Sequence, residues 1–197
     1  MQLLKQIDMK KYLLTILALG TTMMMACSPD NTGGSNEEVK ADYTLTTNIT
    51  KACYDNYGDS HEVNLNFHSI ELSAIEVDEE SNTAVAKMFM IEYLTTLDNT
   101  DGVGTFSPAD SDWANYNNLK ANTYFIGVED EYGSLGAKYM EFDMAVMEYT
   151  VVELIIDGTL NITTNGDKRT IKGLLKTKSG KTLKIDYTGT FVPNKIS

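Results

Sequence analysis

The chain has 197 residues, of which 16 are basic and 28 are acidic, so its formal net charge at pH 7 is −12. A field of this sign repels the phosphates of nucleic acids and the headgroups of anionic lipids, which excludes nucleic acid as an expected partner. Hydrophobic residues make up 42% of the chain, which is enough to build one domain with a packed core.

The first 26 residues have the layout of a bacterial lipoprotein signal. Two adjacent lysines precede an apolar segment, 12–20, that is too short to span a bilayer as a permanent helix. Ala26 then places a small residue directly before Cys27. We therefore expect residues 1–26 to be removed as a signal peptide and the Cys27 thiol to be diacylated. A secretory signal that carries no lipid is the alternative.

The expected processing changes both the charge and the cysteine chemistry of the chain. Residues 1–26 contain three lysines and one aspartate, so their removal shifts the net charge from −12 to −14. Once Cys27 carries lipid, Cys53 is the only cysteine left, and an intramolecular disulfide is excluded. We expect Cys53 to be a small buried apolar residue.

Residues 27–41 predict a flexible tether, because they combine Pro, Gly, Ser, Asn and acids without apolar periodicity. Ser28, rather than aspartate, follows the cysteine, which resembles the sorting rule of Gram-negative lipoproteins for the outer membrane. Asp30 and the later Glu37 and Glu38 resemble the surface-export signals of Bacteroidetes lipoproteins. We expect an outer-membrane protein, lipid-anchored at Cys27 and either surface-exposed or facing the periplasm.

Residues 42–193 predict a single all-β domain, because apolar residues alternate with polar ones at a period of two. The expected fold is an antiparallel β-sandwich or a lipocalin-like barrel of about eight or nine strands. Residues 85–94 also fit a buried helix, and we favour a strand. The expected strands are 43–49, 63–67, 85–97, 123–129, 138–148, 151–163, 170–176 and 182–191.

The clearest prediction is a three-stranded antiparallel meander over residues 158–192. Asn165 and Gly166 tolerate positive φ and suit a hairpin turn, and residues 178–181 supply a second turn. The alternation of apolar and polar residues resumes after each turn.

The glycine and threonine pattern of this meander resembles the C-terminal region of small uncharacterised lipoproteins of Bacteroidetes. The resemblance rests on Asp157–Thr163, Gly180–Lys184 and Tyr187–Phe191, and on Gly104–Ser107 earlier in the chain. It covers residues 43–192 in outline. It implies an all-β module at the cell surface or facing the periplasm, and it carries no catalytic residue across.

No motif of a hydrolase, metalloprotease, nucleotide-binding loop or redox pair occurs in the chain. The only histidines are His61 and His68, and a separation of seven residues places them on opposite faces of a strand. We expect His68 to be half-exposed on its strand rather than a ligand or a base. The sequence therefore predicts a protein that is not an enzyme and that holds no cofactor.

Four aspartates in one loop-rich span offer oxygen ligands of the kind that calcium prefers. Asp98, Asp101, Asp110 and Asp112 do not follow the spacing of an EF-hand, since Thr100 and Gly102 fall where further ligands belong. We favour a solvated acidic loop and no metal, with the first three aspartates as weak candidates.

The only tryptophan predicts a sugar platform. Trp113 and Tyr116 would stack on the apolar face of a pyranose, and Asp112, Asn115 and Asn117 would bond its hydroxyl groups. In the alternative interpretation, which we favour, Trp113 folds back over the core of the sheet.

Together these patterns predict a lipid-anchored binding module of the cell envelope whose partner is a glycan or a surface protein. One alternative is a structural or assembly lipoprotein that pairs with protein partners through its sheet edges. Another is a small barrel that binds an apolar ligand in a cavity lined by methionines. The methionines concerned are Met88, Met90, Met140, Met144 and Met147.

Overall fold

The structure is a computed structural model, and it describes residues 40–80, 83–109, 119–131 and 133–194. These residues are all-β and include no helix, which confirms the predicted class and the strand at residues 85–94. They form twelve strands, more than the eight or nine expected, because short strands flank the long ones. The strands are β1 (Tyr43–Leu45), β2 (Ile49–Gly58), β3 (Leu65–Asp78), β4 (Thr83–Thr96), β5 (Gly104–Pro108), β6 (Thr123–Tyr124), β7 (Val128–Asp130), β8 (Gly133–Leu135), β9 (Lys138–Asp143), β10 (Glu148–Asn165), β11 (Lys168–Thr177) and β12 (Thr182–Thr190).

Ten of these strands form one mixed sheet, and β7 and β8 form a separate hairpin. The strands β2, β3, β4, β9, β10, β11 and β12 each pair antiparallel with the next in this order. The order confirms the predicted C-terminal meander, with Gly166 at φ +63° and Gly180 at φ +86° in its two turns. Strand β1 pairs in parallel with β12, and β5 pairs in parallel with β6. Strands β5 and β6 join the rest of the sheet through antiparallel pairings with β10 and β4 respectively.

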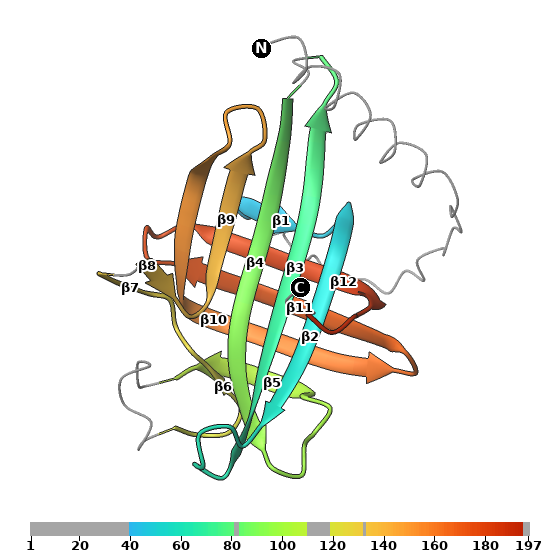
Figure 1. The fold of residues 1–197 in the computed structure, drawn as a ribbon, viewed down its shortest axis with the longest axis vertical. Coiled ribbons are helices and arrows are strands. Elements are labelled where there is room, and N and C mark those ends of the chain that lie inside the picture. Colours follow the sequence, from blue (N-terminus) through green and yellow to red (C-terminus); the bar gives the residue numbers. More distant parts are fainter. Residues whose placement is uncertain (1–39, 81–82, 110–118, 132, 195–197) are drawn as a thin grey trace, which may run out of the picture. The chain divides into compact units, whose positions relative to one another are not determined.

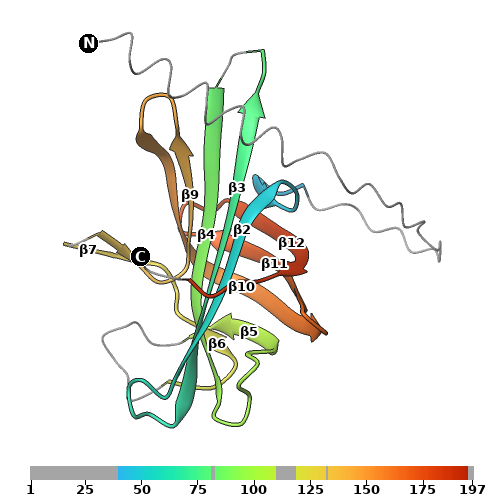
Figure 2. The same cartoon turned by 45° about the vertical axis from the view of Figure 1, so that its right-hand side comes forward.

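The long strand β10 joins the two halves of the sheet. Up to Leu154 it pairs with β9, and from Ile155 onward it pairs with β11, with a register shift between Ile155 and Asp157. In Figure 1 the β2–β4 and β9 strands run upright, and β11 and β12 cross them. Figure 2 shows the same crossing after a turn of 45° about the vertical axis. The apolar core lies between the two halves, because its residues come from strands of both.

The ends of this strand order meet through one backbone bridge. Val192, just beyond β12, lies parallel to Cys53 of β2. Its carbonyl oxygen accepts a hydrogen bond from Tyr54 N and its N donates to Ala52 O, both at 3.0 Å. Cys53 is buried and has a free thiol, as the sequence predicts.

Large aromatic side chains fill much of the core. Tyr93, Tyr124 and Tyr139 are fully buried, and each phenol donates a hydrogen bond, to Gly102 O, Gly158 O and the Glu141 carboxylate respectively. A buried hydroxyl without a partner destabilises a core, so these bonds are what allows tyrosine at these positions.

The methionines do not line a cavity between the halves of the sheet, so the proposed basis for an apolar ligand is wrong. Phe89 points into the core, and its neighbours Met88 and Met90 therefore lie on the opposite, outer face of β4. Met140 pairs with Met88 on that face. Met144 and Met147 are exposed.

Gly102 provides a test of how tightly the core packs. It has φ +62°, and a Cβ there would lie 2.7 Å from the Tyr93 hydroxyl and 3.0 Å from His68 Nδ1. Gly102→Ala should lower the free energy of unfolding by about 2–4 kcal/mol, through backbone strain and steric overlap. Gly166→Ala is the matched control, with φ +63° and nothing within 4 Å, and should cost only about 1 kcal/mol. If urea unfolding showed the same loss of stability in both variants, the core would accommodate the added methyl group at residue 102 at no cost.

Candidate functional site

The aromatic site predicted from the sequence lies outside the described residues. Its members are Asp112, Trp113, Asn115, Tyr116 and Asn117. The metal candidate Asp110 and the lipidation site Cys27 also lie outside the described residues.

Asp98 and Asp101 are described, and both are exposed in the connection between β4 and β5. Within the residues that the structure describes, no three histidine, cysteine, aspartate or glutamate side chains gather as metal ligands would. Hydrogen bonds from the Thr96 hydroxyl and from its own backbone lower the pKa of Asp98. This part of the chain therefore has the character of an acidic turn.

His68 is buried, so the prediction that it is half-exposed is wrong. Its side chain is on the core side of β3, where both ring nitrogens meet hydroxyl groups: Nδ1 lies 2.9 Å from Tyr54 Oη and Nε2 lies 2.8 Å from Thr95 Oγ1. The Tyr93 ring stacks on the imidazole with centroids 5.1 Å apart. Burial lowers the pKa of His68, and together with the smaller effect of the positive charge of Arg169 it brings the pKa to about 4.

Arg169, the only arginine of the chain, is buried in the same cluster. Its guanidinium lies 3.7 Å from the centroid of the Tyr54 ring, and Nη1 donates to Gly102 O at 3.5 Å. Tyr54 Oη also donates to Thr100 O. These contacts hold the β4–β5 connection against β2, β3 and β11, which indicates a structural role for the cluster.

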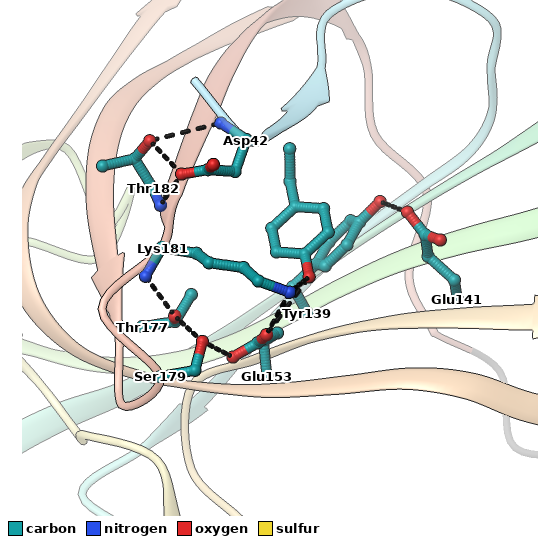
Figure 3. Close-up of polar contacts among 9 residues, drawn as sticks. Asp42, Tyr139, Glu141, Glu153, Thr177, Ser179, Lys181 and Thr182 are labelled. Carbon is teal, nitrogen blue, oxygen red and sulfur yellow. Dashed lines mark hydrogen bonds and ion pairs between the residues drawn. The ribbon is translucent and has the colours of Figure 1, made fainter. Parts of the chain in front are cut away.

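A second polar network surrounds Glu153 at the other edge of the core. Glu153 Oε2 accepts from Ser179 Oγ at 2.7 Å, while Oε1 accepts from Tyr43 Oη at 3.1 Å and forms an ion pair with Lys181 at 3.3 Å. Burial acts to raise the pKa of Glu153, but the hydrogen bonds from Ser179 and Lys181 outweigh it and lower the pKa. Figure 3 shows Glu153, Ser179 and Lys181 converging between the strands.

The same network fixes the point where the chain enters the sheet. Asp42 Oδ2 accepts from the Thr182 backbone N at 2.8 Å and from its hydroxyl at 3.0 Å (Figure 3). These bonds lower the pKa of Asp42. Because Glu153 is ionised and saturated with donors, this network serves as a clamp for β1 and carries no available base.

The described residues also form a groove on the outer face of β2, β3 and β4, which we call the outer groove. It encloses about 250 Å³ and combines one exposed aromatic ring with polar and charged groups. The Tyr57 side chain is 54% exposed, with its hydroxyl 3.3 Å from Ser69 Oγ. Its polar lining includes Glu71, Glu92, Lys138 and Asn194.

Polar contacts order the walls of the outer groove. Asn194 Nδ2 donates to Glu71 Oε2 at 3.2 Å, and Lys51 forms an ion pair with Glu71 Oε1 at 3.2 Å. On the opposite wall, Lys138 Nζ donates to the Ser134 carbonyl at 2.6 Å. The groups that line the groove are therefore held in place without a ligand.

Glu92 lies between the outer groove and a second hollow of about 200 Å³, and Tyr57 borders both. Burial raises the pKa of Glu92 to about 7, and the positive charge of Lys138 opposes this shift. Near neutral pH the carboxyl group therefore exists in both forms, so it both donates and accepts hydrogen bonds.

The chain matches no known protein family, and no curated protein or solved structure matches it either. Among the described residues, no helix has the length and apolar content needed to cross a membrane.

Sequence reasoning missed the outer groove. One signal was present, because Glu92 is the only charge between Met88 and Leu94 in an otherwise apolar strand. Its burial depends on β8 and β9, which come more than 40 residues later in the chain.

The opposite pKa shifts of His68 and Glu92 should nearly cancel in the pH dependence of stability. Between pH 4 and 6.5 the unfolded chain binds the His68 proton and the folded chain does not, so stability falls as pH falls. Between pH 4.5 and 7 the folded chain retains the Glu92 proton, so stability falls as pH rises. Each effect amounts to about 3 kcal/mol.

Glu92→Gln removes one of the two effects. The variant should lose about 2–3 kcal/mol of stability between pH 6.5 and 4.5, relative to the unmodified chain over the same range. The measurement is urea unfolding at several pH values, with Glu129→Gln at an exposed position of β7 as the control. An unchanged pH profile would show that Glu92 titrates normally in the folded protein.

Proposed function

We propose that the protein is a lipid-anchored, non-enzymatic binding module of the outer membrane, and that it binds a glycan in the outer groove. The observation that carries this proposal is the exposed Tyr57 ring beside the Glu92 carboxyl group in a preformed groove. An aromatic ring with fixed hydrogen-bonding groups at its side matches the alternating apolar faces and hydroxyl groups of a sugar.

Each polar group has a role in this proposal. Tyr57 would stack on the apolar face of a pyranose, and Glu92 would both donate to and accept from its hydroxyl groups. Lys138 and the Asn194 amide would donate, and the Glu71 carboxylate would accept. The negative net charge of the chain favours a neutral glycan over one that carries phosphate or sulfate groups.

The first described residue after the predicted aromatic residues lies close to the second hollow. This residue, Leu119, packs against a small core of Phe67, Leu94 and Phe125. Phe67 also lines the second hollow beside Glu92. A sugar platform at Trp113 and Tyr116 therefore remains part of the proposal.

For the fold we propose a lipocalin-like arrangement. It is supported by the meander order of the long strands and by the bridge between Cys53 and Val192 at its two ends.

An assembly role is the second candidate function, and a bare strand edge favours it. Residues 148–153 of β10 pair with β9 on one side, while the pairing with β11 begins only at Ile155. On that other side, no strand among the described residues pairs with them. An extended segment of a partner would add to this edge by backbone hydrogen bonds.

A glycan array tests the outer groove, with the labelled mature chain as the probe. Tyr57→Ala should reduce the apparent affinity at least ten-fold, because stacking area is lost. Tyr149→Ala is the matched control, since Tyr149 is 57% exposed but lies away from the groove. Loss of binding in Trp113→Ala alone would move the site to the aromatic loop. If the folded chain binds no glycan, the ligand class is wrong.

Membrane fractionation tests the anchor. The chain with Cys27 intact should be recovered with the outer membrane, and its N-terminal peptide should carry the mass of a diacylglycerol group. Cys27→Ser should abolish both results, whereas Cys53→Ser should leave both unchanged. Release of the unmodified chain into the soluble fraction would show that the signal is secretory only.

A further inference from the structure

The turn between β9 and β10 presents an unusual run of apolar side chains. Met144, Ala145, Val146 and Met147 follow one another at its tip, and all are exposed, with Val146 at 61% and Met147 at 70%. Hairpin turns ordinarily carry Gly, Asn, Asp or Ser, which satisfy the backbone and remain in water. An apolar tip of this kind on a soluble surface indicates an interaction.

The conformation of this turn is held by the chain itself. Met147 N donates to Asp143 O at 2.9 Å, and Asp143 Oδ1 accepts from Ala145 N at 2.8 Å. Met144 N donates to Ala84 O of β4 at 3.0 Å, which ties the tip to its neighbour. The apolar side chains therefore project from an ordered support.

Met147 has φ +62°, in the left-handed region where glycine or asparagine is the unstrained choice. The chain keeps a long apolar side chain at this position although the backbone disfavours it. Retained strain of this kind is characteristic of a position where the side chain itself has a task.

The chain outside the described residues is long enough to bring this turn to a membrane. The domain begins at Asp42, which is bonded to Thr182, and the next residue packs on Tyr139 with ring centroids 4.8 Å apart. Tyr139 of β9 pairs with Glu153 of β10. Met147, at the tip of the turn, comes six residues before Glu153, so the tip lies about 20 Å along the strand from the start of the domain. Residues 27–41 span up to about 50 Å when extended, so they allow the approach.

The charge of the residues around the turn favours a lipid without net charge over an anionic one. Residues 143–149 contain two acids, Asp143 and Glu148, and no base, and the whole chain is strongly acidic. This charge opposes adsorption to anionic lipid and leaves apolar insertion as the attractive force. Phe142 and Tyr149 contact each other edge to face at the base of the turn, 5.2 Å between centroids, where aromatic rings suit the headgroup level.

We propose that Met144–Met147 insert into the surface of a zwitterionic phospholipid bilayer and hold the domain against the membrane. The biological setting rests on the proposed anchor at Cys27, but insertion by the turn is a property of the domain alone. It is thus tested without lipid on the protein.

The test is co-sedimentation of the mature chain, from residue 27 with Cys27→Ser, with phosphatidylcholine vesicles at millimolar lipid. The chain should bind, and Val146→Asp with Met147→Asp should reduce its partition coefficient at least ten-fold. Met147→Gly should reduce it about three-fold while the resistance to urea is kept or raised, which separates lost insertion from lost folding. Leu97→Asp, at an apolar residue 46% exposed in the β4–β5 connection, should have no effect.

Equal binding by the Asp variants, or no binding by the unmodified chain, would overturn the proposal. A dimer in analytical ultracentrifugation that depends on Val146 and Met147, without vesicle binding, would also overturn it and assign the turn to a second copy of the chain. These results leave the test of the lipid on Cys27 unaffected, so failure of either proposal is recognised separately.

Discussion

The change of partner along β10 is the constraint on which the rest of the structure depends. A single strand of 18 residues serves both halves of the sheet, and its register shifts where it passes from β9 to β11. Gly158 permits this passage, because it has φ +111° and a Cβ there would overlap the carbonyl oxygen of Leu174. The crossing of the two halves creates the inner space that the aromatic core fills, and it leaves the outer face of β3 and β4 available for a groove.

The polar groups of the domain are divided between the two faces of the sheet. On the inner face they are saturated: His68 and Arg169 bond to hydroxyl and carbonyl groups, and Glu153 accepts three donors. Saturated groups of this kind stabilise a particular packing and have no capacity left for a ligand. Glu92 on the outer face differs, since it is desolvated and borders open space. This contrast separates the structural networks from the candidate binding site.

Alternation and turn residues were sufficient to predict the all-β class and the C-terminal meander, because both are local properties of the chain. Strand β2 was missed beyond Ile49, since its polar residues obscure the period. The burial of His68 could not be predicted either, because its ring contacts Tyr93 and Thr95, which are distant in sequence. The outer groove is likewise assembled from segments between Tyr57 and Asn194. Positions of this kind depend on how the strands cross, which the periodicity of the sequence does not encode.

The placement of Arg169 gives the domain an internal reporter of its integrity. Every other basic residue is a lysine or one of two histidines, so a protease that cuts only after arginine has a single target in the chain. That target lies in β11, paired on both sides with β10 and β12, and its guanidinium is enclosed by Tyr54. A protease needs an extended, accessible segment, so cleavage there requires β11 to separate from β10 and β12 at the end next to the β10–β11 turn. The rate of that one cut therefore measures how often this end of the β10–β11 hairpin opens and the guanidinium leaves the Tyr54 ring.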